Sequence, residues 1–430
     1  MARFDLGIAA GFGLDALAEA GMLAGASLDM DFAGNRIYGA SSFTSALAIT
    51  RASTGYAENA AGVWSSFASG ALRITDKGIL IEEARTNSIR NNSMQGAVVG
   101  TPGTLPTNWS VTGHAGLTRT IIGIGTVNGV DYIDVRYSGT ASGTFGRIIF
   151  DGPTAIAATS GQTWTLSCFL ALVGGTISGT TNFYMLVNEN TSGGVLVNEQ
   201  SSIKVLTGSL QRYSSTFTLV GGGTVAALDG RIGFNMTSEQ PVDFTLRIGW
   251  PQLELGAFAT SPIRTTSAAA TRAADIITVN SPTNYVSLAQ GSSFVEWGEL
   301  VGAAAATDRR MFNMRVDSSN SLSMNIVGGN AGLVVTNAGA VQASLYSSGP
   351  VVANNTYKMA VRWGTNNFAM RKSAGLGSDP ANDTSGTPPL GAFVAGVGNG
   401  NSSVFLNGYI RRLAFFQSPQ SDAALSAMVA

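Results

Sequence analysis

Cysteine, histidine and charged residues are scarce in this 430-residue chain, and each scarcity excludes a type of chemistry. The single cysteine, Cys168, cannot form an intramolecular disulfide. The single histidine, His114, excludes most zinc sites, and its isolation in a glycine- and threonine-rich segment argues against a catalytic triad. Charged residues make up 12% of the chain, the net charge is −1, and lysine and arginine are dispersed. We therefore predict that nucleic acid is not a partner.

Long apolar segments are also missing. Asp5, Asp15 and Glu19 interrupt the N-terminal segment, and no window reaches the roughly 18 apolar residues of a membrane span. The sequence therefore predicts no membrane insertion, no secretion signal and synthesis in the cytoplasm. Residues 15–24 are expected to form a short helix capped by Asp15. The glycine-rich runs lack a strand–loop–helix context, so we interpret them as turns and predict no cofactor.

Short alternating apolar segments, separated by clusters of glycine, serine, asparagine and threonine, fill most of the chain. This pattern predicts an all-β protein with tandem antiparallel β-sandwiches, one over residues 91–278 and one over residues 279–430. Cys168 alternates with apolar neighbours and is expected in the first core. Residues 1–90 form a mixed region that is too thin for a core of its own. We expect neighbouring subunits or the next domain to supply that core.

Two adjacent carboxylates, Glu82 and Glu83, stand out in the segment GILIEEARTN. Successive side chains of a strand point to opposite faces, so these two carboxylates cannot aim at one reacting centre as an acid/base pair must. We therefore predict a structural role, in which Arg85 pairs with Glu83 or with another carboxylate.

A short echo links ITRAS at residues 49–53 with ATRAAD at residues 270–275. The match is too short to prove a repeat. We interpret it as two similar strand entries, in which Arg51 and Arg272 hold a loop by hydrogen bonds to backbone carbonyls.

Four segments together carry a family resemblance: ITRASTGYAENAAGV, GILIEEARTN, PQLELGAFATSPIRTTSAAATRAAD and NGYIRRLAFFQSPQSDAALSAM. Their combination resembles structural proteins of tailed bacteriophages and prophages, in which such segments precede sugar-binding modules. Residues 105–265 resemble a carbohydrate-binding-module jelly roll, and residues 285–430 resemble a concanavalin A/laminin-G-like sandwich. The first 40 residues resemble nothing that we can name.

The resemblance implies a non-enzymatic virion protein, a fibre, spike or decoration subunit of the head, neck or tail. Its implied location is the virion, after synthesis in the host cytoplasm. Residues 1–90 would attach the subunit to the particle, and both sandwiches would face outward. The implied partners are other virion structural proteins, further copies of the chain in a homotrimer, and polysaccharide on the host cell surface.

Sugar-binding sandwiches combine an aromatic face, which stacks on a pyranose ring, with amides or carboxylates that bind its hydroxyls. Asn182, Tyr184 and Asn188 have the same strand parity and follow a glycine- and threonine-rich loop. These three residues are the candidate glycan-binding site, and the alternative is an ordinary sandwich surface or core.

Calcium is a further candidate ligand, because laminin-G-like domains sometimes hold this ion through oxygen ligands in loops. Asp308, Asp317 and Asn320 supply such oxygens here. Their spacing is common by chance, so the alternative is a set of unrelated loop residues.

Two other functions compete with the virion structural protein. A polysaccharide-degrading appendage, or depolymerase, would need two carboxylates on facing strands and usually a long β-helix with regular repeats, and the sequence contains no such repeat. An exported lectin or adhesin would need a signal sequence, which the chain does not show.

Overall fold

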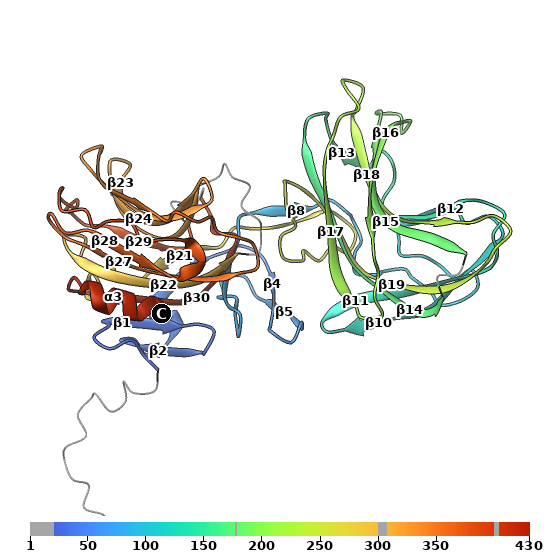
Figure 1. Cartoon of the computed structure of the whole chain (residues 1–430). Helices are drawn as coiled ribbons and strands as arrows, with labels where there is room; N and C mark the ends of the chain where they lie inside the picture. The colour runs from blue at the N-terminus through green and yellow to red at the C-terminus, as the bar shows by residue number, and fades with distance from the viewer. Residues whose placement is uncertain (1–20, 177–178, 300–307, 400–403) are drawn as a thin grey trace, which may run out of the picture. The chain divides into compact units, whose positions relative to one another are not determined.

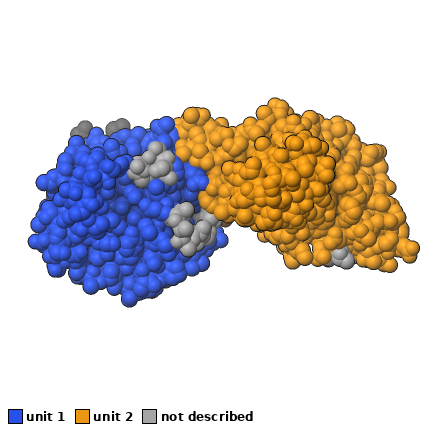
Figure 2. Space-filling model, turned by 90° about the horizontal axis from the view of Figure 1, so that it is seen from above, with its two compact units in different colours: residues 1–50, 72–83, 275–430 blue, residues 51–71, 84–274 orange. Residues whose placement is uncertain are grey.

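The computed structural model describes residues 21–176, 179–299, 308–399 and 404–430. About 52% of the chain is strand and 5% is helix, and every strand pair is antiparallel in the described part, so the predicted all-β fold is confirmed. The chain divides into two compact units (Figure 1, Figure 2). Unit 1 contains residues 1–50, 72–83 and 275–430, and unit 2 contains residues 51–71 and 84–274.

Unit 2 is a sandwich of two sheets. The β19 sheet has the strand order β10-β11-β19-β14-β17, and the β18 sheet has the order β16-β15-β18-β12-β9, with β13 also paired to β18. The strands are β9 (Ser110–Gly113), β10 (Leu117–Val127), β11 (Val130–Thr140), β12 (Phe145–Ile149), β13 (Ile156–Ala157), β14 (Thr163–Thr176), β15 (Thr180–Asn190), β16 (Leu196–Lys204), β17 (Gln211–Thr218), β18 (Ala227–Met236) and β19 (Pro241–Leu255). The core lies between the sheets and includes Cys168, as predicted, with Val135, Met185, Ile232 and Phe244.

Segments outside the sandwich proper also belong to unit 2. The hairpin of β4 (Gly55–Glu58) and β5 (Trp64–Phe67) packs Tyr56 and Trp64 against Phe169 and Trp250. A second pair joins β8 (Arg85–Asn87) to β20 (Ala270–Arg272).

Unit 1 is a second sandwich. The β30 sheet has the order β2-β1-β30-β22-β27-β28, with β7 beside β30 and β6 beside β7, and the β23 sheet has the order β26-β25-β24-β23-β29-β21-β3. The strands are β1 (Leu28–Asp31), β2 (Arg36–Tyr38), β3 (Leu47–Thr50), β6 (Ile74–Thr75), β7 (Gly78–Ile81), β21 (Ile276–Val279), β22 (Gly291–Glu299), β23 (Arg309–Asp317), β24 (Asn320–Val327), β25 (Asn330–Asn337), β26 (Ala340–Tyr346), β27 (Thr356–Trp363), β28 (Ala369–Lys372), β29 (Val394–Val397) and β30 (Gly408–Phe416).

Short helical segments accompany these strands: α2 (Phe43–Ala46), η1 (Pro282–Asn284), η2 (Ala374–Leu376) and α3 (Asp422–Val429). The C-terminal helix α3 begins after Ser421, which is its N-cap. It buries Leu425 and Val429 against the outward side of the β30 sheet, so that this side is covered (Figure 1). The helix expected over residues 15–24 falls mostly outside the described residues. In the part of the chain that the structure describes, no helix combines the length and apolarity needed to cross a membrane.

The N-terminal region is not a separate body, and the boundaries 1–90, 91–278 and 279–430 differ from the observed units. Leu28 pairs with Phe415 across β1 and β30, and β3 pairs with β21, so the first strands complete the C-terminal sandwich. Leu28 and Met30 are fully buried within this single chain. Of the two sources expected for the core of this region, the C-terminal sandwich of the same chain supplies it, and the oligomeric state stays a prediction.

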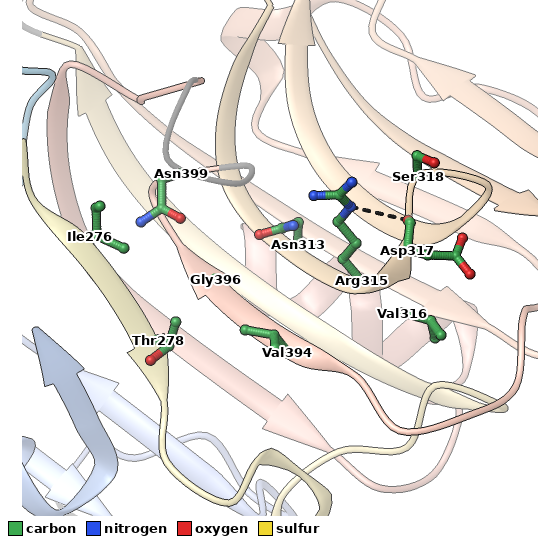
Figure 3. Close-up of a pocket in the computed structure, with 10 residues that line it drawn as sticks. All are labelled: Ile276, Thr278, Asn313, Arg315, Val316, Asp317, Ser318, Val394, Gly396 and Asn399. Atoms are coloured by element: carbon green, nitrogen blue, oxygen red, sulfur yellow. Dashed lines mark hydrogen bonds between the residues drawn. The ribbon is translucent and has the colours of Figure 1, made fainter. Parts of the chain in front are cut away.

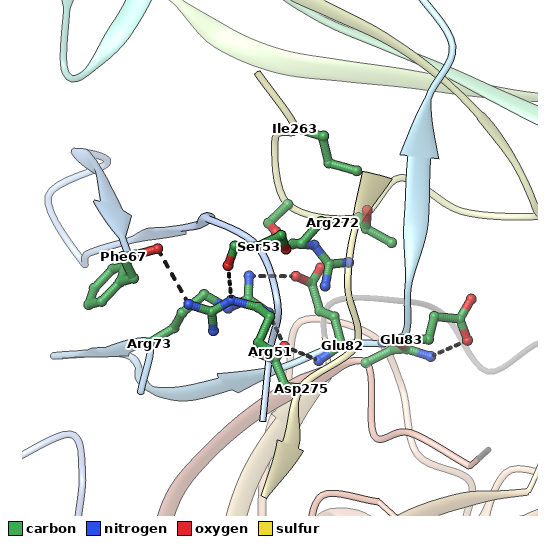
Figure 4. Close-up of polar contacts among 12 residues, drawn as sticks. Arg51, Ser53, Phe67, Arg73, Glu82, Glu83, Ile263, Arg272 and Asp275 are labelled. Atoms are coloured by element: carbon green, nitrogen blue, oxygen red, sulfur yellow. Dashed lines mark hydrogen bonds and ion pairs between the residues drawn. The ribbon is translucent and has the colours of Figure 1, made fainter. Parts of the chain in front are cut away.

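The predicted structural role of the adjacent carboxylates agrees with their contacts in unit 1 (Figure 4). Glu82 is buried and accepts a hydrogen bond of 2.8 Å from Arg73, which also pairs with Asp275. Glu83 accepts a 3.2 Å hydrogen bond from the Asn407 amide. Arg85 lies in unit 2, where it donates to the Leu255 carbonyl oxygen, and its pairing with Glu83 or another carboxylate stays a prediction.

The predicted clamp by buried arginines is clearest at Arg51 in unit 2. Its guanidinium donates to the carbonyl oxygens of Ser53 at 3.0 Å and Ala68 at 2.7 Å (Figure 4). Arg272 is equally buried and donates to the neighbouring Ala273 carbonyl at 3.4 Å. Arg51 thus fixes the loop that leads from the β4–β5 hairpin.

Candidate functional site

The three predicted glycan-binding residues lie on β15, and strand parity places them as expected. Phe183, Met185 and Val187 point into the core, so Asn182, Tyr184 and Asn188 share the outward face of the β18 sheet. The exposed fractions are only 6% for Tyr184 and 3% for Asn188. An aromatic platform for a sugar ring must be open to solvent, and this tyrosine is not.

Charged side chains from neighbouring strands cover this face. Arg147 on β12 forms two hydrogen bonds with Glu199 on β16, of 2.6 and 2.9 Å, and so reaches across β18 and β15. The Tyr184 ring lies over Gly233, where a Cβ atom would collide with it. Burial lowers the pKa of Arg147, but hydrogen bonds with Tyr184 and Glu199 outweigh burial and raise that pKa above its ordinary value.

Asn188 is part of the same network. With its amide oriented to suit its neighbours, Asn188 accepts a hydrogen bond of 2.8 Å from Arg231 and donates one of 3.2 Å to Glu199. These groups satisfy one another, so little hydrogen-bonding capacity is left for a sugar. Asn182 alone borders a pocket, of about 200 Å³, together with Phe183 and Lys204.

The candidate calcium ligands do not form one site. Asp308 precedes β23 and Asp317 ends it, so nine residues of extended chain place them about 30 Å apart. Asp317 and Asn320 share a turn, in which the amide of Asn320 donates to both carboxylate oxygens at 3.0 Å. Asp308 pairs with Arg310 at 3.0 Å. No group of three His, Cys, Asp or Glu side chains suited to a metal occurs among the described residues.

A groove of about 710 Å³ crosses the outward face of the β23 sheet in unit 1 (Figure 3). Three adjacent strands, β23, β29 and β21, form it. Its volume lies within the range of about 300–1,000 Å³ that is typical of small-ligand sites. The lining residues are Ile276, Thr278, Asn313, Arg315, Val316, Asp317, Ser318, Val394, Gly396 and Asn399.

Strand alternation explains which side chains of β23 line the groove. On β23, Phe312 and Met314 are fully buried in the sandwich, and Phe312 packs against Phe415 of the opposite sheet. Asn313 and Arg315 therefore point outward into the groove. The outward side of the β30 sheet, unlike that of the β23 sheet at the groove, is covered by α3.

Gly396 forms the floor of the groove. A Cβ atom at this position would overlap Asn313 Oδ1 and lie 3.1 Å from Asn399 Oδ1, so the two amides meet above a residue without a side chain. The Asn399 amide nitrogen donates to the backbone oxygens of Val397 at 3.2 Å and Ile277 at 3.4 Å, which directs its oxygen toward the groove. The exposed fractions of Asn313 and Asn399 are only 2% and 3%, so their side chains are held in place and offer the groove single polar atoms, whereas stacking on Tyr184 would need an open ring face.

Arg315 carries the positive charge of the groove. Its Nε atom donates to the Asp317 carbonyl oxygen at 3.1 Å, and its terminal nitrogens point over the groove (Figure 3). The Asp317 carboxylate points away from Arg315 (Figure 3). Hydrogen bonds from the Asn320 side chain and the Ser319 backbone lower the pKa of Asp317 and keep it ionised within its turn.

Sequence reasoning named only Asp317 among the groove residues. Alternation predicts that Asn313 and Arg315 share a face, but nothing in the sequence shows that β23 lies beside β29, or that β29 lies beside β21. The signal that was available is Gly396 within the short apolar segment Val394–Val397, because a strand-interior glycine can mark a close approach.

No protein-family model and no curated protein matches the sequence. Among solved structures, a carbohydrate-binding module of Ruminococcus gnavus sialidase, CBM40 bound to α2,6-sialyllactose, is 13% identical with a TM-score of 0.25, and the match covers 34% of this chain and 85% of that one. The tandem CBM22 modules of Paenibacillus barcinonensis Xyn10C are 11% identical with a TM-score of 0.24, covering 79% and 96%.

The mouse laminin α1 domains LG4-5 are 10% identical with a TM-score of 0.20, and the match covers 61% of this chain and 82% of that one. Similarity at this level carries no argument about ligands or reactions. The fold and the groove define this chain as a protein of two antiparallel β-sandwiches with a groove of ligand size on unit 1.

Proposed function

We propose that this chain is a non-enzymatic, glycan-binding structural protein, and that the groove on unit 1 is its binding site. The observation that carries the proposal is the composition of the groove, which combines fixed amides at Asn313 and Asn399 and a hydroxyl at Thr278 with apolar edges at Ile276 and Val394. A sugar presents the matching chemistry, because its hydroxyls need such donors and acceptors and its CH groups contact apolar side chains.

The carboxylate content of the groove supports a binding role over hydrolysis. Glycosidases generally use two carboxylates about 5–10 Å apart on either side of the scissile bond. Among the described residues, Asp317 is the one carboxylate that lines the groove, and its hydrogen bonds hold it in the turn after β23. The chain therefore binds its glycan without cleaving it.

The virion setting of this proposal rests on the resemblance to tailed-phage structural proteins. The subunit is a fibre, spike or decoration protein of head, neck or tail, acts as a homotrimer together with other virion proteins, and contacts polysaccharide on the host surface. Its attachment surface is not a detachable N-terminal region, because residues 28–50 and 72–83 supply strands to the sandwich of unit 1 and the β4–β5 hairpin belongs to unit 2. Antibody labelling of particles in electron micrographs tests the setting, and label on the bacterial surface instead would favour an exported lectin.

The binding proposal is tested with a glycan array and two matched glycine variants of unit 1. Gly396→Val fills the floor of the groove and should abolish binding, whereas Gly364→Val should leave it unchanged, because a Cβ at position 364 meets nothing closer than 3.8 Å. Circular dichroism confirms that both variants are folded. Equal binding by both variants would reject the groove as the site.

A release assay on the same glycans separates binding from cleavage. The proposal predicts no new reducing ends after prolonged incubation with the wild-type protein. Reducing ends that disappear in a single-carboxylate variant such as Asp317→Asn would establish the depolymerase alternative instead.

A further inference from the structure

We infer that the groove on unit 1 selects acidic glycans, and that Arg315 binds the carboxylate of a uronic or sialic acid residue. This inference rests on the proposed function and adds the chemical class of the ligand. Arg315 differs from the other groove residues because it brings a fixed positive charge with a planar, two-pronged donor geometry.

The hydrogen bonding of Arg315 leaves the two terminal nitrogens of its guanidinium, Nη1 and Nη2, available for a ligand. Its Nε atom donates to the backbone oxygen of Asp317, which fixes the plane of the guanidinium. Within the described ranges, neither Nη1 nor Nη2 has a hydrogen-bond partner, and no carboxylate forms a salt bridge with Arg315. Most arginines on these sandwiches differ in this respect. Arg136, for example, is engaged by Asp243 through both Nε and Nη2, at 2.8 and 2.7 Å.

The charges around the fork favour an anion. The neutral side chains of Asn313, Asn399 and Thr278 line the groove beside Arg315, and apolar side chains limit its hydration. Asp317 is the nearest negative group of the lining and attracts Arg315 electrostatically without forming a salt bridge with it, because its oxygens accept hydrogen bonds from Ser319 and Asn320 in the turn and its carboxylate points away from the guanidinium (Figure 3). An entering carboxylate would therefore meet two free N–H donors without displacing an existing partner.

The apolar and neutral groups can accommodate the rest of the sugar. Gly396 leaves room at the floor, and the amides above it can bind ring hydroxyls. The groove thus pairs one site for a charged group with a neutral surface beside it. This arrangement distinguishes a carboxylated sugar from an inorganic anion, which would use Arg315 alone.

The test compares matched charged and neutral oligosaccharides by isothermal titration with the full-length chain. Sialyllactose is compared with lactose, and trigalacturonate with its methyl ester, so that the two arms separate sialic from uronic acids. Wild-type protein should bind at least one acidic member about tenfold or more tightly than its neutral partner, because hydrogen bonds to charged groups are the stronger ones. Raising the salt concentration should reduce this preference.

Three variants complete the design. Arg315→Gln should remove the preference for the acidic sugar and leave weak binding of the neutral one, and Arg315→Lys should restore part of it, because lysine keeps the charge without the fork. Arg136→Gln removes a matched charge in unit 2 and should leave the affinities for acidic and neutral sugars unchanged.

The outcomes separate this inference from the proposed function. If Gly396→Val abolishes binding and Arg315→Gln binds acidic sugars like the wild type, the groove binds glycans but the assignment of Arg315 is wrong. If neutral sugars bind as tightly as acidic ones, the inference is also overturned. If neither substitution changes binding of any sugar, both proposals fail.

Discussion

Replacement of Arg73 by methionine should destabilise unit 1 severely, because Arg73 neutralises two buried carboxylates. Arg73, Glu82 and Asp275 are each exposed by 1% or less. Arg73 donates to Glu82 at 2.8 Å, and Asp275 also accepts the Glu82 backbone N–H at 3.0 Å. Burial lowers the pKa of Arg73, but Asp275 and Glu82 outweigh it and raise that pKa above its ordinary value, so the arginine stays charged.

The expected cost follows from what the substitution leaves behind. Arg73→Met removes the guanidinium that contacts both carboxylates and leaves them close together in a buried site. Removing one partner of a buried ion pair costs about 3–5 kcal/mol, a large part of the total stability of a domain. Arg73→Met combined with Glu82→Gln and Asp275→Asn should recover part of this loss, because it also removes the negative charges that Arg73 balances.

Hydrogen exchange resolved by mass spectrometry is the appropriate assay, because a two-unit chain need not unfold in one step. In Arg73→Met, the backbone amides of β22 and β30 should exchange hydrogen faster than in the wild type. The amides of β14 and β18 in unit 2 should exchange at the wild-type rate and serve as the internal reference. Arg136→Met, which breaks an exposed ion pair, is the control and should leave both sets unchanged. A loss below about 1 kcal/mol in Arg73→Met would refute the argument.

Three further predictions concern unit 2. Burial raises the pKa of the Cys168 thiol, so a maleimide should label it only after unfolding; rapid labelling of native protein would contradict its place in the core. Burial also raises the pKa of Glu254, so its contribution to stability should be fully present in acid and decline as the pH rises above about 4, and the denaturation midpoint of Glu254→Gln should depend less on pH. Gly129→Ala should cost about 1–3 kcal/mol, because φ is +80° and a Cβ would collide with the Trp64 carbonyl; unchanged proteolysis of the β4–β5 hairpin would count against this.

Local patterns predicted the strands well, because alternation is a property of each segment by itself. The segment around Cys168 shows this, since its alternating apolar residues lie in the core of unit 2. The division into units could not be predicted in the same way. It depends on β1 pairing with β30, where Leu28 meets Phe415, and no local pattern specifies a partner so distant in the sequence.

The candidate site shows the same limit. Parity correctly placed Asn182, Tyr184 and Asn188 on one face, but it could not show that Tyr184 and Asn188 are buried there or that Arg147 reaches over this face from another strand. The groove on unit 1 was missed, because it exists only once β23, β29 and β21 lie side by side. Sequence order separates β21 from β29 by more than a hundred residues.

The most direct test of glycan binding by unit 1 is a crystal structure of the full-length chain soaked with the tightest-binding oligosaccharide from the array. The account predicts sugar density in the groove, with hydroxyls on Asn313 and Asn399 and an acidic group on the Arg315 fork. Density on the outward face of the β18 sheet beside Asn182, with the groove empty, would contradict it.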